Sequence, residues 1–139
     1  MTKQQLLLDL YAAISAGKTG DALARFFTAD AQQVEYPSLM RPAGSTRGIA
    51  AMLEAADQGT GAIVDQRYDL HTFLEQGERA AVQFTWSGRC AIDLGPLPGG
   101  TRLTAHIAAF YEFEHGLVKR QSSYDCYEPI APTGVVTAT

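Results

Sequence analysis

The chain of 139 residues has few cysteines, few basic residues and no long hydrophobic run. Its two cysteines, Cys90 and Cys126, match no metal-binding spacing, so we expect two free, buried thiols in a cytoplasmic protein. The 11 Lys and Arg are outnumbered by 15 Asp and Glu, which gives a net charge of −4. This balance, without any basic stripe, argues against a nucleic-acid partner. No apolar run reaches about 18 residues and no charged segment precedes an apolar one, so we expect neither a membrane span nor a secretory signal.

The length and composition indicate one folded domain. Hydrophobic residues make up 46% of the chain, and a chain of this size buries about two-thirds of its unfolded surface. It can therefore carry a core and a ligand pocket. We expect one domain over residues 1–129, followed by an irregular tail over 130–139.

The pattern of hydrophobic residues predicts helices first and strands afterwards. Residues 2–16 place Leu6, Leu10 and Ile14 on one face at helical spacing, with Thr2 as the N-cap. The other predicted elements are short helices at 20–27 and 48–57, a strand at 31–36, a loop at 38–47, and strands at 63–75, 79–94 and within 103–127. Leading helices followed by about four antiparallel strands indicate an α+β fold, with helices on one face of a curved sheet.

The last predicted element is a β-hairpin with the sharpest chemical signal in the sequence. His115 and Gly116 suit a two-residue turn, since Gly116 can adopt a positive φ. An unbroken ladder from this turn pairs His106 with Asp125, and opposed side chains have Cβ atoms roughly 4.5–5.5 Å apart. The two residues could form an acid/base pair that moves a proton, or an ion pair that only holds two strands in register.

Several segments together resemble the SnoaL-like branch of the nuclear transport factor 2-like superfamily. They are YAAISAG at 11–17, FFTADAQQVEYP at 26–37, RGIAAML at 47–53, VQFTWSG at 82–88, LPGG at 97–100, and AHIAAFYEFEHGLVKRQSSYDCYEP at 105–129. The resemblance implies a cone-shaped half-barrel, a bent sheet wrapped around a long helix with a pocket between them. It also implies a homodimer that pairs across the outer sheet face. An apolar outer patch of Ile107, Ala109, Tyr111 and Val118 would serve that contact.

Within this superfamily the residues favour some activities over others. The steroid isomerases carry an aspartate base where this chain has Tyr36, and their helix-one tyrosine is one residue away from Tyr11, to which we assign no role. The epoxide hydrolases need charged residues at positions held here by Cys90, Ile92 and Ser123. The SnoaL-type cyclases use a His and an Asp for proton transfer, which matches His106 and Asp125 in chemistry.

The same resemblance predicts which side chains line the pocket. We expect Asp125 and His106 to shuttle the proton and Tyr36 to hold a substrate oxygen, although Tyr36 could equally be a core aromatic. The expected ligand-binding residues are Gln32, Val34, Trp86, Phe110, Gln121 and Ser123, of which Trp86 also suits a pocket wall. Polar residues among them favour a lined cavity over a dry core.

The sequence therefore predicts a cofactor-free enzyme of the cyclase, isomerase or dehydratase kind. Its ligand would be a small apolar or aromatic carbonyl compound. The alternative is a non-catalytic protein that binds a small ligand in the same pocket. No clustered set of His, Cys and carboxylate residues indicates a metal site.

Overall fold

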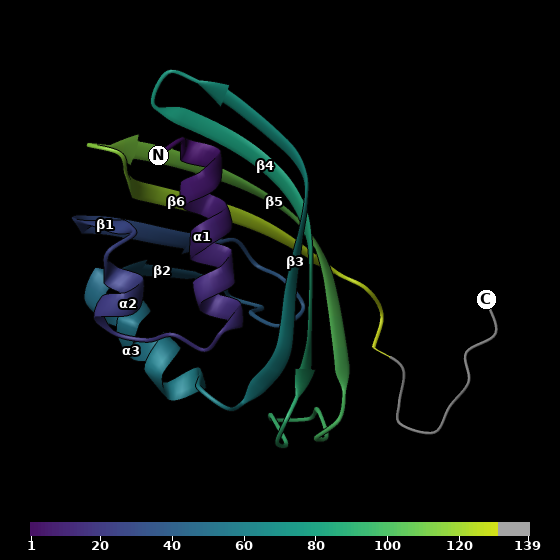
Figure 1. Ribbon diagram of the computed structural model, residues 1–139. Helices are drawn as coiled ribbons and strands as arrows, with labels where there is room; N and C mark the ends of the chain where they lie inside the picture. Colours follow the sequence, from purple (N-terminus) through teal and green to yellow (C-terminus); the bar gives the residue numbers. More distant parts are fainter. Residues whose placement is uncertain (131–139) are drawn as a thin grey trace.

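The structure is a computed structural model that describes residues 1–130 (Figure 1). The tail predicted over 130–139 therefore lies, apart from Ile130, outside the described residues. The elements are α1 (Lys3–Ser15), α2 (Asp21–Ala24), β1 (Phe27–Glu35), β2 (Ser45–Gly48), α3 (Ile49–Gly59), β3 (Ile63–Gln76), β4 (Arg79–Cys90), β5 (Arg102–Glu114) and β6 (Leu117–Tyr127). One curved, open sheet carries all three helices on the same side, which confirms the α+β half-barrel.

The six strands lie in the order β2-β1-β6-β5-β4-β3. The strands from β3 to β6 are antiparallel, as predicted. In contrast, β1 joins β6 in parallel, and β2 forms inside the segment predicted as a loop. A parallel pair between segments so far apart in sequence leaves no local signal, because its register depends on how the whole chain crosses over.

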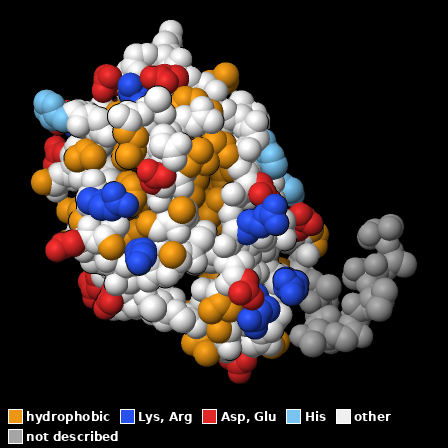
Figure 2. All heavy atoms as spheres, viewed as in Figure 1, with side chains coloured by type: hydrophobic (Ala, Val, Ile, Leu, Met, Phe, Trp, Pro, Cys, Tyr) orange, Lys and Arg blue, Asp and Glu red, His pale blue; other side chains and the backbone are white. Residues whose placement is uncertain are grey.

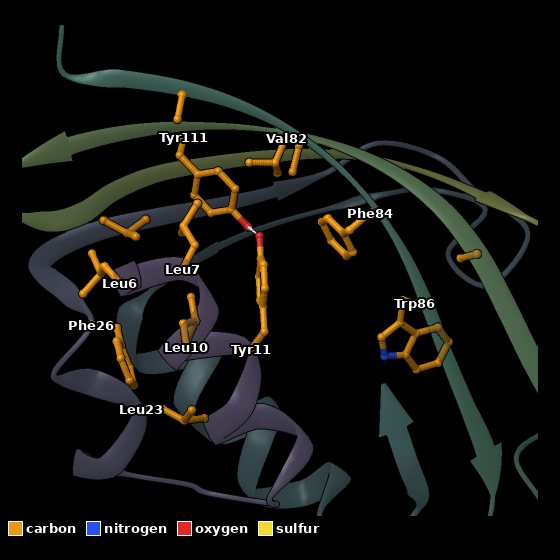
Figure 3. Close-up of a cluster of buried hydrophobic side chains, with 14 of the residues drawn as sticks. Leu6, Leu7, Leu10, Tyr11, Leu23, Phe26, Val82, Phe84, Trp86 and Tyr111 are labelled. Atoms are coloured by element: carbon orange, nitrogen blue, oxygen red, sulfur yellow. Dashed lines mark hydrogen bonds between the residues drawn. The ribbon is translucent and has the colours of Figure 1, made fainter. Parts of the chain in front are cut away.

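Helix α1 packs its apolar face on the inner face of the sheet (Figure 3). The Thr2 hydroxyl accepts a hydrogen bond from the Gln5 backbone N–H at 3.1 Å, the predicted N-cap. Leu6 and Leu10 are buried as expected, whereas Ile14 is only half-buried. Leu7 and Tyr11 add to this face, so the core lies between α1 and strands β4 to β6.

The closing hairpin has the predicted turn but a different register. His115 and Gly116 both have positive φ, 52° and 75°. After the turn, Phe113 pairs with Val118 while Glu112 pairs with Arg120, so Lys119 is an extra, bulged residue. Beyond this β-bulge every pair is displaced by one residue, which exchanges the two faces of one strand relative to the other. The predicted pairing of His106 with Asp125 is therefore wrong.

The bulge also corrects the predicted outer patch. Ala109, Tyr111 and Val118 are buried and face α1, and Ile107 lines a cavity on the same inner side. The outer face instead carries three exposed aromatic rings, with Tyr36 stacked on Tyr124 at 4.5 Å between centroids and Phe110 edge-on to Tyr124 at 6.2 Å.

Two further properties concern the described residues 1–130. No helix there is long and apolar enough to cross a membrane. Cys90 and Cys126 are both free thiols, but only Cys90 is buried. The expectation that both would be buried is wrong for Cys126, because alternation places it on the outer face of β6.

Candidate functional site

A cavity opens between the inner sheet face and the helices. Its main part, called here the main cavity, has a volume of about 500 Å³ and is bounded by α1, the aromatic side chains of β3 and β4, and the inner side of β6. A second part of about 450 Å³, called here the α3 lobe, extends under α3 and shares Gln33, Glu35, Arg41 and Gln66 with the main cavity. The size and the mostly apolar lining suit a small organic molecule.

One wall of the main cavity is polar. The parallel register of β1 and β6 pairs Gln33 with Gln121 and Glu35 with Ser123, and all four side chains line the cavity. Asp125 lies two residues further along β6 on the same face. Five polar side chains on these two strands thus face the cavity among apolar ones, where polar groups need partners.

Asp125 combines partial burial in this set with an unsatisfied oxygen atom. Its Oδ1 atom is buried and has no hydrogen-bond partner among the described residues. Burial raises the pKa of the Asp125 carboxyl, the nearby Glu35 carboxylate raises it further, and Ser123 partly opposes the shift. A carboxyl group with a raised pKa and an unused oxygen in a cavity can accept or donate a proton to a bound molecule.

Glu35 is the second carboxylate of the site, and it is held by two arginines. Its oxygens lie 3.3 Å from Nε of Arg41 and 3.9 Å from a terminal nitrogen of Arg47. The loop after β1 reaches this position because Gly44 passes close to the β1 backbone. A Cβ on Gly44 would lie 2.6 Å from the Glu35 carbonyl oxygen, and its φ of +67° also favours glycine.

A pair of tyrosines lies deeper in the same site (Figure 3). The hydroxyl oxygens of Tyr11 and Tyr111 are 2.7 Å apart, and the Tyr11 ring stacks on Tyr68 at 4.7 Å. Tyr111 is buried and its hydroxyl has no other hydrogen-bond partner among the described residues. At this distance either hydroxyl can be the donor. Of the two residues, Tyr11 lines the main cavity, so its hydroxyl is the one that a bound molecule can reach.

Burial also keeps these phenols neutral. It raises the pKa of Tyr11 and Tyr68 well above the usual value, with the Tyr111 hydrogen bond lowering that of Tyr11 slightly. It raises the pKa of Tyr127, another cavity residue, to about 12, with Asp125 and Glu35 adding to the effect. Each phenol is therefore a donor at neutral pH.

Four of the predicted site residues line the main cavity. They are Asp125, Gln121, Ser123 and Trp86. The indole N–H of Trp86 donates to Gln66 at 3.1 Å, which holds the ring against the cavity as a wall.

The structure places the predicted proton-transfer partner, His106, elsewhere. Its Nε2 lies 3.0 Å from a carboxylate oxygen of Glu128 on the outer face, and its side chain is 60% exposed. The cause is the bulge at Lys119, which sets Ile107 opposite Asp125. His106 and Asp125 therefore lie on opposite faces of the sheet, and the predicted proton shuttle between them lacks the required contact.

The remaining predicted site residues also lie on the outer face. They are Gln32, Val34, Tyr36 and Phe110. Gln32 accepts a hydrogen bond from Arg120 at 3.2 Å, and Tyr36 stacks on Tyr124. The prediction for β1 placed Gln32, Val34 and Tyr36, the more apolar of its two faces, in the pocket. Ala31 is buried, however, so the face that carries Ala31, Gln33 and Glu35 points inward.

Sequence reasoning missed Gln33, Glu35 and Tyr11. The small Ala31, in step with Gln33 and Glu35, was the available signal for the inward face of β1. Tyr11 lies within the predicted first helix, one residue away from the helix-one tyrosine of the steroid isomerases, and received no role for that reason. Among residues 1–130 no three His, Cys, Asp or Glu side chains come together as a metal site would require.

The chain belongs to the SnoaL-like domain family, whose model matches residues 7–121. The fold is shared with a candidate polyketide cyclase from Pseudomonas putida, at 25% identity and TM-score 0.69, covering 89% of this chain and 91% of that one. IdmH, a candidate polyketide cyclase from Streptomyces antibioticus, is similar at 16% identity and TM-score 0.71, covering 90% and 92%. A candidate isomerase from Rhodopseudomonas palustris is similar at 20% identity and TM-score 0.69, covering 92% and 90%. No curated protein matches the chain.

The raised pKa of Asp125 predicts a pH-dependent gain in stability for Asp125→Asn. The folded protein holds this proton to higher pH than the unfolded chain, whose Asp pKa is about 3.9. The Asp125 carboxyl group therefore stabilises the folded protein most at a pH below the pKa of the unfolded chain. This contribution to the free energy of unfolding is lost as the pH rises through the pKa of the folded protein. We expect Asp125→Asn to melt about 2–5 °C higher than the wild type at pH 7.5, since screening through the open cavity limits the gain to the order of 1 kcal/mol.

Thermal melts between pH 3.5 and pH 8 measure this gain, with the exposed Asp57→Asn as the matched control. The difference in melting temperature between Asp125→Asn and the wild type should disappear as the pH falls toward 3.5. Asp57→Asn should melt at the same temperature as the wild type at every pH. A variant less stable than the wild type at pH 7.5 would show that the Asp125 charge supports the fold.

Proposed function

We propose that this protein is a small-molecule enzyme that uses acid/base chemistry without a cofactor or metal. Its substrate is a small, mainly apolar carbonyl compound bound in the main cavity. One observation carries this proposal: the Asp125 carboxyl group has a buried oxygen without a hydrogen-bond partner among residues 1–130, inside a cavity of small-molecule size. A buried carboxyl oxygen without a hydrogen bond destabilises the folded protein. Such a group is typical of a site where a bound ligand supplies the missing partner.

The proposed step is a proton transfer at the carbon next to a carbonyl group. The Asp125 carboxylate removes that proton, the carbon–hydrogen bond electrons form the enolate, and negative charge develops on the carbonyl oxygen. The Tyr11 O–H, polarised by the bond from Tyr111, donates to this oxygen. Enolate formation is the step that isomerase, cyclase and dehydratase chemistry share. In an isomerase the Asp125 proton returns to another carbon. In a cyclase the enolate carbon forms a bond to a second carbonyl carbon and the proton goes to the oxygen of that carbonyl. In a dehydratase the bond from a neighbouring carbon to its hydroxyl group breaks, and the proton leaves with that hydroxyl as water.

The names of similar solved structures support this reaction class. The structural neighbours include proteins named as candidate cyclases and a candidate isomerase, on the same fold. The free thiols Cys90 and Cys126 are compatible with the cytoplasmic location that we also propose.

A general proton-transfer assay tests the proposal without knowledge of the natural substrate. 2-Tetralone, a bicyclic ketone small enough for the main cavity, exchanges its α-protons for deuterium in D₂O, and NMR follows the loss of signal. An enzyme of the proposed kind should exchange these protons faster than buffer does, with saturation at rising ketone concentration. Binding of 2-tetralone without faster exchange would favour the non-catalytic binding protein.

We further propose a homodimer that pairs through the outer sheet face. The support is the exposed ring cluster of Tyr36, Phe110 and Tyr124, with exposed fractions of 38%, 53% and 47%. Rings of this kind, grouped on one sheet face, are typical of an interface.

Sedimentation at micromolar concentration should give twice the 15.0 kDa mass of one chain. Because a charge cannot be buried unpaired in an apolar contact, Phe110→Glu should shift the protein to monomers. The matched change on Leu8, which is exposed on α1 at the opposite side of the sheet, should leave the dimer intact. A wild type found only as monomers would refute the dimer.

A further inference from the structure

The α3 lobe has an unbalanced charge. Of the described side chains that line it, Lys18, Arg41 and Arg47 are basic and Glu35 alone is acidic. This excess of positive charge is unexpected in a chain whose net charge is −4. The space-filling view of the helix side shows hydrophobic side chains near the centre, with Lys and Arg side chains on either side of them (Figure 2).

Glu35 does not use the full donor capacity of the two arginines. Arg41 and Arg47 each approach it through one nitrogen, at 3.3 and 3.9 Å, and neither pair is bidentate. Their guanidinium groups form no other ion pair among residues 1–130. A guanidinium group has five N–H donors in a planar fork that suits a carboxylate. Most of these donors are therefore available to a bound molecule.

Apolar side chains form the remaining walls of the lobe. They come from α3 and from the strand and loop opposite, and include Met52, Leu53, Ala56, Ile63 and Leu94. Such a lobe fits a ligand that is apolar along its length and charged at one end. Because the α3 lobe and the main cavity share Gln33, Glu35 and Gln66, one molecule can reach from the arginines toward Asp125.

We propose that the α3 lobe is an anion subsite, in which Arg41 and Arg47 bind the carboxylate end of an aromatic or long aliphatic keto acid. The inference rests on the proposed function, because the carbonyl group of the same molecule would lie in the main cavity. It narrows the substrate class from apolar carbonyl compounds to amphipathic ones with a terminal acid. Lys18, exposed at the rim of the lobe, attracts the anion without contacting it closely.

A matched pair of ligands separates charge from shape. 1-Naphthaleneacetic acid carries a carboxylate beside an apolar ring system, and 1-naphthaleneacetamide has nearly the same shape without the charge. Isothermal titration calorimetry should show roughly tenfold tighter binding of the acid than of the amide, as expected for charged hydrogen bonds. The acid should lose affinity as salt is added, while the amide should not.

Variants of the arginines complete the test. Arg47→Gln, and separately the more exposed Arg41→Gln, should each weaken binding of the acid about tenfold and leave the amide unchanged. Arg67→Gln, on the exposed side of β3, is the matched control and should alter neither. Glu35→Gln should tighten binding of the acid, because it frees both guanidinium groups. Thermal melts show whether each variant is folded, and Arg41→Gln remains informative if Arg47→Gln is not.

Three results would overturn the subsite: equal affinity for acid and amide, no binding of the acid at millimolar concentration, or an acid affinity that the arginine variants do not change. Exchange of 2-tetralone by the wild type tests the proposed function separately, because this ketone has no carboxylate. Wild-type exchange together with equal affinity for the acid and the amide would refute the subsite alone, whereas absence of exchange would refute the proposed function.

Discussion

Asp125→Asn should reduce the exchange rate of 2-tetralone by 10²–10⁴-fold while leaving the fold intact. The amide has nearly the same shape as the carboxyl group but cannot take up the proton. General acid/base catalysis by one positioned group contributes a factor in this range. The reduction should fall on kcat more than on KM, because the proton is transferred only in the reaction step.

Three matched variants show whether this effect belongs to Asp125. Asp57→Asn makes the same change on the exposed surface and should leave the rate unchanged. His106→Gln should also leave it unchanged, because His106 lies on the outer face with Glu128. Glu35→Gln should lower the apparent pKa of the rate profile, since removal of the neighbouring negative charge lowers the pKa of Asp125. An Asp125→Asn protein with wild-type exchange would eliminate Asp125 as the base.

Tyr11→Phe should reduce the same exchange rate by roughly 10²–10³-fold, the range seen when one donor to a developing oxyanion is removed. The physical reason is the direction proposed for the hydrogen bond between the two tyrosines, in which Tyr111 donates to Tyr11 and Tyr11 donates its own proton to the ligand. Tyr11→Phe should also lower stability by about 1–3 kcal/mol, because the buried Tyr111 hydroxyl then loses its one partner among the described residues.

Tyr111→Phe is the matched comparison, because it removes the other hydroxyl of the pair. It should reduce the rate by less than about tenfold, as the Tyr11 O–H remains in place and loses only its polarising bond. If Tyr11 instead donates to Tyr111, Tyr11→Phe will reduce the rate by less than about tenfold. Exchange rates of the two variants therefore identify the donor, and melting temperatures show that both variants are folded.

Parts of the site were predictable from local pattern. Alternation along β6 places Gln121, Ser123 and Asp125 on one face, and this face is the cavity wall. It was predictable because the bulge at Lys119 precedes all three residues and does not alter their order relative to one another. The partners across the ladder were not predictable, because one extra residue exchanges the faces of β5 relative to β6.

The carboxylate pair of Glu35 and Asp125 shows a second limit. These residues lie on β1 and β6, two strands that pair in parallel although most of the chain separates them in sequence. Their proximity depends on the crossover and on the loop that brings Arg41 and Arg47 to Glu35. No periodicity within either strand reports such a contact, and the more apolar face of β1 proved to be the outer one.

The sequence by itself determined the fold class of this protein and most of its elements, with β2 as an exception. Hydrophobic periodicity, the Thr2 cap and the turn at His115 and Gly116 are local, so they specify a first helix and antiparallel strands regardless of distant contacts. Tertiary structure alone decided which side chains meet. A β-bulge, a parallel crossover and a buried tyrosine pair assembled Asp125, Glu35 and Tyr11, because each depends on the free energy of packing the whole sheet around α1.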